Sequence, residues 1–146
     1  MIALDTNLLV YAHHPDSPEH GATRRAIETL VAEEEGCWGV ALPTIAEFWT
    51  VVTHPKLKAQ RSSVEQARRF LTALIDAGAR IYEPGDRFGE RLTGAAVDLG
   101  VQGPRIFDLQ IALTAFDNGV TRIWTHDERF VAMPGQRVYN PLSPAG

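Results

Sequence analysis

A short apolar run that ends in a carboxylate opens the chain. Residues 2–4 (IAL) precede Asp5, and a second apolar stretch begins three residues after it. Open α/β sheets commonly present their chemistry where a strand delivers a polar side chain to its C-terminal tip and then turns into a helix. The pattern therefore predicts that Asp5 lies at the edge of a sheet, directly before a helix.

The rest of the chain alternates between strand-like and helix-like segments. We expect strands at about 2–4, 38–42, 80–82, 122–125 and 137–139, and helices at about 6–13, 19–35, 43–52, 62–78, 86–99, 107–117 and 128–131. This alternation favours an α/β fold, with a mainly parallel sheet of four to five strands and helices on both faces. Because there are 146 residues and no repeat or linker-like stretch, a single domain is expected over 1–146.

Composition excludes several classes of protein. With 45% apolar and 22% charged residues, the chain has the make-up of a soluble globular domain. No apolar stretch approaches the roughly 20 residues that span a bilayer, and the N-terminus lacks a signal-peptide pattern. Cys37 is the only cysteine, which excludes an internal disulfide and a thiolate zinc site. We therefore expect a cytoplasmic protein with no membrane partner.

The charge balance bears on nucleic-acid binding. The chain carries 14 basic and 18 acidic residues, a net charge of −4. This balance argues against a protein that coats nucleic acid non-specifically. It is compatible with a nuclease, because acids clustered around a metal ion would account for much of the excess.

Four acidic residues lie at or near predicted helix starts, and each has a purely structural interpretation. Asp5 would act as an N-cap, and Glu47 would complete a capping box that begins at Thr44. Asp108 falls in a first helical turn, where the helix dipole favours negative charge. Asp127 would open the short helix after the fourth strand. Taken singly, each acid is as well explained by local structure as by function.

Taken together, the four acids indicate a metal site. Helices that follow parallel strands begin at one edge of the sheet, so acids at several such starts converge in space. Two carboxylates ~5 Å apart repel by ~3 kcal/mol at an effective dielectric constant of ~20, more than the ~1 kcal/mol of an N-cap. A cation would relieve this repulsion. All-oxygen ligands select Mg²⁺ or Mn²⁺, ions that commonly handle phosphates.

Five stretches carry a resemblance to a known family. They are residues 2–7 (IALDTN), 43–48 (PTIAEF), 107–112 (FDLQIA), 124–130 (WTHDERF) and 137–142 (RVYNPL). In this order the chain resembles PIN-domain nucleases, and most closely the VapC-type ribonuclease toxins of type II toxin–antitoxin systems. The resemblance covers essentially the whole chain and implies an Mg²⁺- or Mn²⁺-dependent endoribonuclease with one or two ions in each active site.

The resemblance also assigns roles to residues. The acidic quartet that holds the metal corresponds to Asp5, Glu47, Asp108 and Asp127, with Thr6, Asn7 and Thr125 in supporting positions. The implied reaction is hydrolysis of an RNA phosphodiester by metal-activated water, which leaves a 5′-phosphate and a 3′-hydroxyl. Glu47 has two possible roles, as a metal ligand or as the base for the water.

Three basic residues are candidates for contacts with the RNA. Arg105 precedes Asp108 by three residues, on the loop that leads into its helix, where it would either grip a phosphate or pair with a nearby acid. Lys56 and Lys58 lie in a basic loop suited to the phosphate backbone. The resemblance further implies a small VapB-like antitoxin and a homodimer.

Two other functions stay open at this point. A haloacid-dehalogenase-like phosphohydrolase would use Asp5 as a covalent nucleophile, but it needs a second Asp two residues on, and position 7 is Asn. A PIN-like module without catalysis would serve as a scaffold in an RNA-processing assembly. The sequence does not specify which RNA is cut, the number of metal ions or the identity of the antitoxin.

Overall fold

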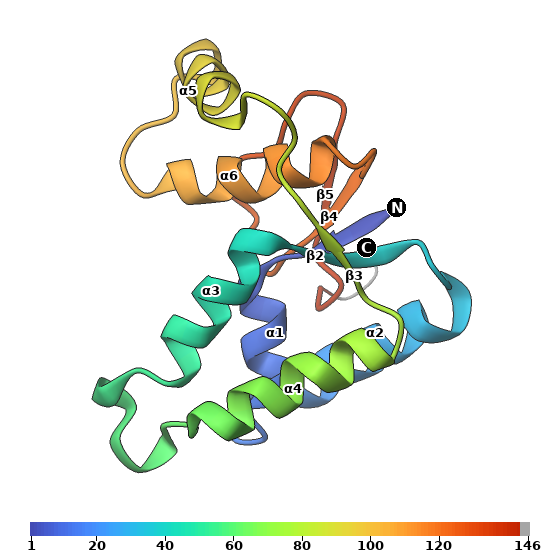
Figure 1. Cartoon of the computed structure of the whole chain (residues 1–146). Helices are drawn as coiled ribbons and strands as arrows, with labels where there is room; N and C mark the ends of the chain where they lie inside the picture. The colour runs from blue at the N-terminus through green and yellow to red at the C-terminus, as the bar shows by residue number, and fades with distance from the viewer. Residues whose placement is uncertain (144–146) are drawn as a thin grey trace.

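A five-stranded, fully parallel sheet forms the centre of the protein (Figure 1). The computed structural model describes residues 1–143. The strands are β1 (Ile2–Leu4), β2 (Trp38–Ala41), β3 (Arg80–Tyr82), β4 (Arg122–Trp124) and β5 (Arg137–Tyr139), in the order β3-β2-β1-β4-β5. β1 therefore lies in the middle, and Leu4, its last residue, is paired with Trp124 of β4.

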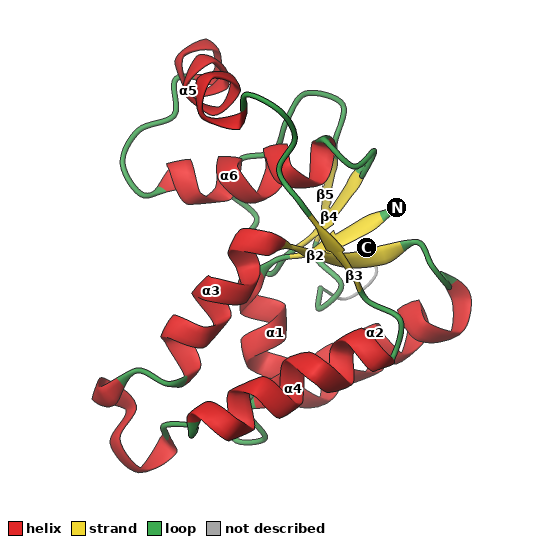
Figure 2. Ribbon diagram, viewed as in Figure 1, coloured by secondary structure: helices red, strands yellow, loops and turns green. Residues whose placement is uncertain are grey.

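Helices cover both faces of the sheet, which confirms the predicted α/β class (Figure 2). They are α1 (Thr6–His13), α2 (His20–Glu33), α3 (Leu42–Val52), α4 (Val64–Asp76), α5 (Phe88–Leu99) and α6 (Arg105–Phe116), with a 3₁₀ segment, η1 (Pro55–Gln60), between α3 and α4. α5 and α6 lie on one side of the sheet, and α1, α2 and α4 lie on the other.

The two layers enclose two apolar clusters, one on each face of the sheet. Successive residues of β1 contribute to both, because side chains alternate across a strand. Ile2 and Leu4 pack with Phe48 of α3 on one face, whereas Ala3 packs with Ile111 of α6 on the other. All of these residues are buried. The strand that ends at Asp5 is thus held from both sides.

Most predicted elements are present, with two differences that affect the site. The prediction of a helix at 128–131 was wrong. The segment forms a turn, in which Phe130 N–H donates to the carbonyl of Asp127. Phe130 is buried against the sheet, and Val131 N–H donates to the carboxylate of Asp108. These tertiary contacts replace the helical hydrogen bonds of this segment. The helix expected at 107–117 begins earlier, at Arg105, which places Arg105 on the helix and not on the preceding loop.

None of the helices within residues 1–143 is both long and apolar enough to cross a membrane.

The backbones of β2 and β3 leave no room for a side chain at Gly39 of β2. A Cβ atom at this position would lie 2.1 Å from the carbonyl oxygen of Arg80 on the neighbouring strand β3. Such a distance is far inside van der Waals contact, and the obstructing atoms belong to the backbone, so they cannot rotate away. Only glycine fits between β2 and β3 at this point.

We expect Gly39→Ala to destabilise the protein by about 2 kcal/mol or more, because overpacking a core typically costs about 1–3 kcal/mol. Gly94→Ala is the matched control: it adds the same methyl group within α5, where no atom lies within 4 Å. It should stabilise the protein by about 0.5–1 kcal/mol through helix propensity. Urea unfolding measures both changes, and equal stabilities would contradict the close β2–β3 approach.

Candidate active site

The four acids named from the sequence lie together at the C-terminal edge of the sheet. Asp5 follows β1 directly, and Asp127 lies three residues after β4. Glu47 is in the second turn of α3 and Asp108 in the first turn of α6. Their charges act on one another: Asp108 and Asp127 both contribute to raising the pKa of Asp5, and Asp5 and Asp108 contribute to raising that of Glu47.

Asp5 is the most enclosed of the acids, with 8% of its surface exposed. Its Oδ1 accepts the backbone N–H of Thr6 at 2.7 Å, and its Oδ2 accepts the hydroxyl of Thr125 at 2.7 Å. Burial raises the pKa of the carboxyl, and the two hydrogen bonds oppose that rise. Asp5 is therefore both the N-cap of α1 and a member of the acidic cluster, so the two interpretations of this residue are compatible.

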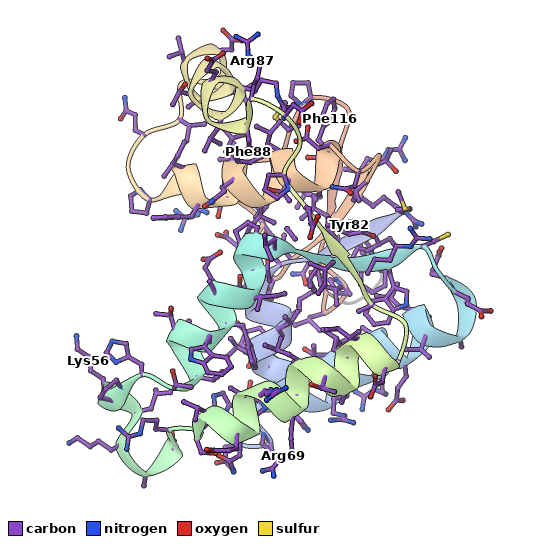
Figure 3. The ribbon with its side chains drawn as sticks, viewed as in Figure 1. Lys56, Arg69, Tyr82, Arg87, Phe88 and Phe116 are labelled. Atoms are coloured by element: carbon purple, nitrogen blue, oxygen red, sulfur yellow. The ribbon has the colours of Figure 1, made fainter. Side chains whose placement is uncertain are left out.

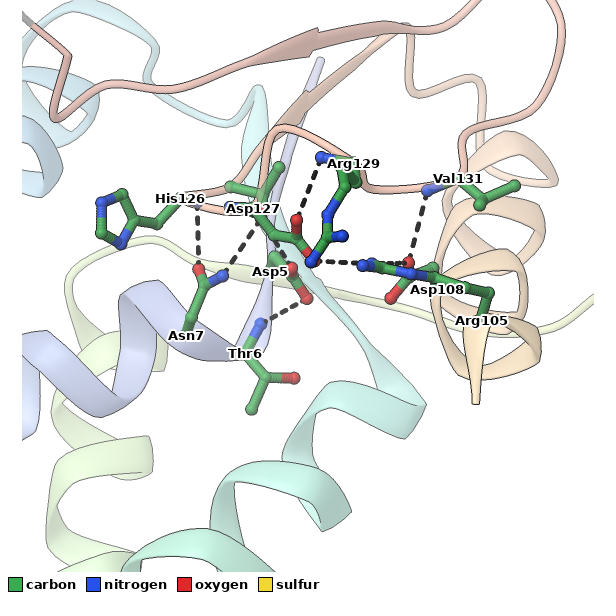
Figure 4. Close-up of polar contacts among 10 residues, drawn as sticks. Asp5, Thr6, Asn7, Arg105, Asp108, His126, Asp127, Arg129 and Val131 are labelled. Atoms are coloured by element: carbon green, nitrogen blue, oxygen red, sulfur yellow. Dashed lines mark hydrogen bonds and ion pairs between the residues drawn. The ribbon is translucent and has the colours of Figure 1, made fainter. Parts of the chain in front are cut away.

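Thr125 ties the ends of β1 and β4 together. Its hydroxyl donates to Asp5, and it accepts the backbone N–H of Asp127 at 3.0 Å and the side-chain amide of Asn7 at 3.2 Å. The other end of that amide, Asn7 Oδ1, accepts the N–H of His126 at 3.3 Å. This network orients the carboxylate of Asp5 and the loop that carries Asp127 (Figure 4).

Glu47 turns towards the cluster and does not cap its helix. α3 begins at Leu42 with Ala41 as its N-cap, so the capping box expected from Thr44 and Glu47 is absent. Glu47 Oε2 instead accepts the hydroxyl of Thr6 at 3.3 Å. Burial is the main cause that raises the pKa of Glu47, followed by the charge of Asp5. A raised pKa brings a carboxylate closer to the range in which it can accept a proton near neutral pH.

Arg105 joins two of the acids. Its Nη1 lies 2.9 Å from Oδ2 of Asp108 and 2.6 Å from Oδ2 of Asp127 (Figure 4). The three-residue spacing puts Arg105 and Asp108 on the same side of α6. The guanidinium holds the pKa of Asp127 below its usual range. Of the two roles left open from the sequence, the ion pair is the one formed here.

Lys56 and Lys58 are not part of this cluster. Both lie in η1, and Lys56 is at the end of α3 that points away from the sheet (Figure 3). His126 is adjacent to Asp127. Its ring lies beyond Asn7, on the opposite side of the cluster from Arg105 (Figure 4). Its Nδ1 lies 3.0 Å from the hydroxyl of Tyr11. The sequence carries no signal for this contact, because it joins residues 115 positions apart.

The chemistry of the cluster fits a hard divalent cation. Its polar groups are carboxylate and hydroxyl oxygens, which suit Mg²⁺ or Mn²⁺, and the charge of Asp108 contributes to raising the pKa of both Asp5 and Glu47. Within residues 1–143, however, no three His, Cys, Asp or Glu side chains are close enough together to hold a metal ion. The guanidinium of Arg105 supplies positive charge to the cluster instead.

The family follows from comparison with known proteins. A family model described as PIN domain matches residues 2–136. The chain belongs to the PIN domain family. It is 32% identical over 143 residues to Ribonuclease VapC43 of Mycobacterium tuberculosis, which covers 97% of this chain and 96% of that protein. It is 26% identical to Ribonuclease VapC48 of the same organism, with coverage of 95% and 96%.

Solved structures share the architecture of this PIN domain. One is VapC20 of Mycobacterium tuberculosis, described as a Sarcin-Ricin loop cleaving toxin, with a TM-score of 0.67, 15% identity, and coverage of 89% of this chain and 92% of that chain. Another is VapBC2 from Rickettsia felis bound to a DNA fragment, with a TM-score of 0.69, 19% identity, and coverage of 96% and 98%. At these identities, the similarity concerns the fold.

The raised pKa of Asp5 makes a prediction about the stability of the metal-free PIN domain. Because the folded state binds the Asp5 proton more tightly than the unfolded chain, this stabilisation is present below the usual pKa of 3.8 and is lost as the pH rises through the folded-state pKa. Asp5→Asn stays neutral and keeps a good N-cap. It should therefore be more stable than the wild type at pH 7 in EDTA, and this advantage should shrink towards pH 4.

Urea unfolding in EDTA across this pH range measures the effect. Asp98→Asn, the same change on the exposed surface of α5, controls for the loss of one negative charge. A loss of about 1 kcal/mol for Asp5→Asn at pH 7 would instead indicate that capping dominates its contribution to stability.

Proposed function

We propose that this PIN domain is a VapC-type ribonuclease toxin, an endoribonuclease that hydrolyses RNA phosphodiester bonds. Two observations support the proposal. The chain is 32% identical, over nearly its full length, to proteins named as VapC ribonucleases. The observation that carries the chemistry is the convergence of Asp5, Glu47, Asp108 and Asp127 at one edge of the sheet, where their charges act on one another.

In this proposal the four acids would hold one or two Mg²⁺ or Mn²⁺ ions. When bound, such an ion polarises a phosphoryl oxygen and lowers the pKa of a water molecule, so that hydrolysis proceeds near neutral pH. Asp5 and Asp108 would be direct ligands. The all-oxygen donor set supports this assignment, as does the charge of Asp108, which contributes to raising the pKa of both Asp5 and Glu47.

The remaining residues would orient the acids and move a proton. Thr125 and Thr6 hold the carboxylates of Asp5 and Glu47 through their hydroxyls, and Asn7 holds Thr125. Glu47, whose pKa is raised, would accept the proton of the attacking water. The water oxygen would bond to phosphorus as the bond between phosphorus and the 3′-oxygen breaks. The departing 3′-oxygen would take up a proton from solvent, which leaves a 5′-phosphate and a 3′-hydroxyl.

The two alternative functions are less well supported. A haloacid-dehalogenase-like enzyme needs an acid at position 7, and Asn7 here is engaged with Thr125 and the backbone of His126. A scaffold without catalysis would not need to keep four mutually repelling acids at one edge. We further propose a VapB-like antitoxin as partner, because similar solved structures include VapBC2 and FitAB bound to DNA fragments. A homodimer is proposed only from the resemblance to VapC-type toxins.

The function is tested by RNA cleavage in the presence of Mg²⁺ or Mn²⁺. Asp108→Asn should lower the cleavage rate at least about 100-fold, the order lost when one charge-stabilising group is removed from an active site. Asp98→Asn, the same substitution on exposed α5, should cleave at the wild-type rate. Comparable RNA cleavage rates for the two variants would contradict the proposed function.

Metal binding is measured independently by thermal unfolding. Saturating Mn²⁺ at about 100 times its dissociation constant should raise the Tm of the wild type by about 5–10 °C. The Asp5→Asn/Asp108→Asn double variant should show no comparable rise. Equal shifts in the two proteins would place the metal elsewhere.

We also propose that Lys56 and Lys58 contact the RNA backbone beyond the cleaved bond. Both are exposed, and they belong to a basic segment that also includes His54 and Arg61. The Lys56→Gln/Lys58→Gln variant should weaken RNA binding and flatten the slope of log affinity against log salt by about 1–2. Arg69→Gln, on exposed α4, is the control (Figure 3). An unchanged salt slope would remove both lysines from the interface.

A further inference from the structure

Arg105 occupies the carboxylate oxygens that a metal ion would need. One nitrogen, Nη1, donates to Oδ2 of both Asp108 and Asp127, at 2.9 Å and 2.6 Å. The ion pairs lie at the rim of the cluster, where the side chains of Arg105 and Asp127 are 34% and 35% exposed and that of Asp108 is 19% exposed. Partly exposed pairs of this kind exchange readily for other partners.

Two cations cannot share these oxygens without repelling each other. A divalent ion bound by Asp108 and Asp127 would face the positive charge of Arg105 at close range, and arginine does not lose its proton to relieve the conflict. Among the described residues no three acidic side chains are placed to hold a metal ion, although four acids converge there. The guanidinium holds two of the acids in an arrangement suited to itself.

We propose that Arg105 is a built-in counter-ion that competes with the divalent metal for Asp108 and Asp127. It stabilises the acidic cluster of the metal-free protein, and it must leave these two carboxylates before they can close on a metal ion. Arg105 thereby sets the metal concentration at which the site fills. The inference rests on the proposed function, because it requires that these acids bind a metal.

Arg129 provides a matched comparison. It contributes positive charge near Asp127 and is exposed, but only its backbone N–H bonds to that carboxylate, at 3.0 Å from Oδ1. Arg129→Gln therefore removes a nearby charge without removing a side chain from the metal ligands. Arg105→Gln removes a similar charge and also removes the guanidinium from Oδ2 of Asp108 and of Asp127.

Isothermal titration with Mn²⁺ measures the competition on the purified full chain. Arg105→Gln should bind Mn²⁺ about three- to tenfold more tightly than the wild type, as expected for the release of two partly exposed ion pairs. Arg129→Gln should change the affinity by less than about twofold. Equal gains in the two variants, or no gain for Arg105→Gln, would overturn the proposal.

Two further measurements examine the same exchange without activity. In EDTA, Arg105→Gln should melt below the wild type, and its Mn²⁺-induced rise in Tm should be larger. In the wild type, saturating Mg²⁺ should release the Arg105 guanidinium. NMR would detect this release as faster exchange of the guanidinium N–H protons with water. The Arg105 signals are identified as those that are missing from the spectrum of Arg105→Gln. Guanidinium signals that Mg²⁺ leaves unchanged would contradict displacement.

The titrations also separate this proposal from the one on which it rests. If the wild type and the Arg105→Gln variant both fail to bind Mn²⁺, the proposed metal-dependent function is wrong, and the inference about Arg105 is wrong as well. If the wild type binds Mn²⁺, the Asp5→Asn/Asp108→Asn variant does not, and Arg105→Gln binds no more tightly, then only the role of Arg105 is wrong.

Discussion

Parallel pairing of β1 with β4 brings Asp5 within hydrogen-bond distance of Thr125, 120 positions away in the chain. The rest of the site depends on this junction. Thr125 fixes one oxygen of Asp5 and at the same time receives the N–H of Asp127, so the central strand and the loop after β4 share one hydroxyl. Apolar clusters on both faces of the sheet bury β1 and so fix the position of Asp5 at its end.

The same edge concentrates negative charge, and the protein manages that charge in different ways for different acids. Asp5 and Glu47 are enclosed, and their pKa values are raised mainly by burial. Asp127 lies further out, where Arg105 holds its pKa below the usual range. In the proposed metal-dependent function, Arg105 would stabilise the acids at the rim before a metal ion binds and would then be displaced by it.

Local and functional interpretations of a residue need not exclude each other. Asp5 is an N-cap and also part of the acidic cluster, since its two oxygens serve the two roles separately. Glu47 differs, because α3 starts at Leu42, before the capping box that Thr44 would open. The earlier start leaves the side chain of Glu47 free to meet Thr6, a contact across 41 positions that no local pattern predicts.

The sequence by itself determined the class of fold and which four acids share an edge of the sheet. Buried parallel strands require short apolar runs, and helices that follow them require polar starts, so the spacing of these features predicts which acids share an edge. Only the tertiary structure decided how the acids are neutralised and where the chain departs from local propensity. Arg105 reaches Asp127 across 22 positions, and the turn after Asp127 replaces a helix because Phe130 is buried against the sheet. Such contacts depend on distances in space, which periodicity along the chain does not encode.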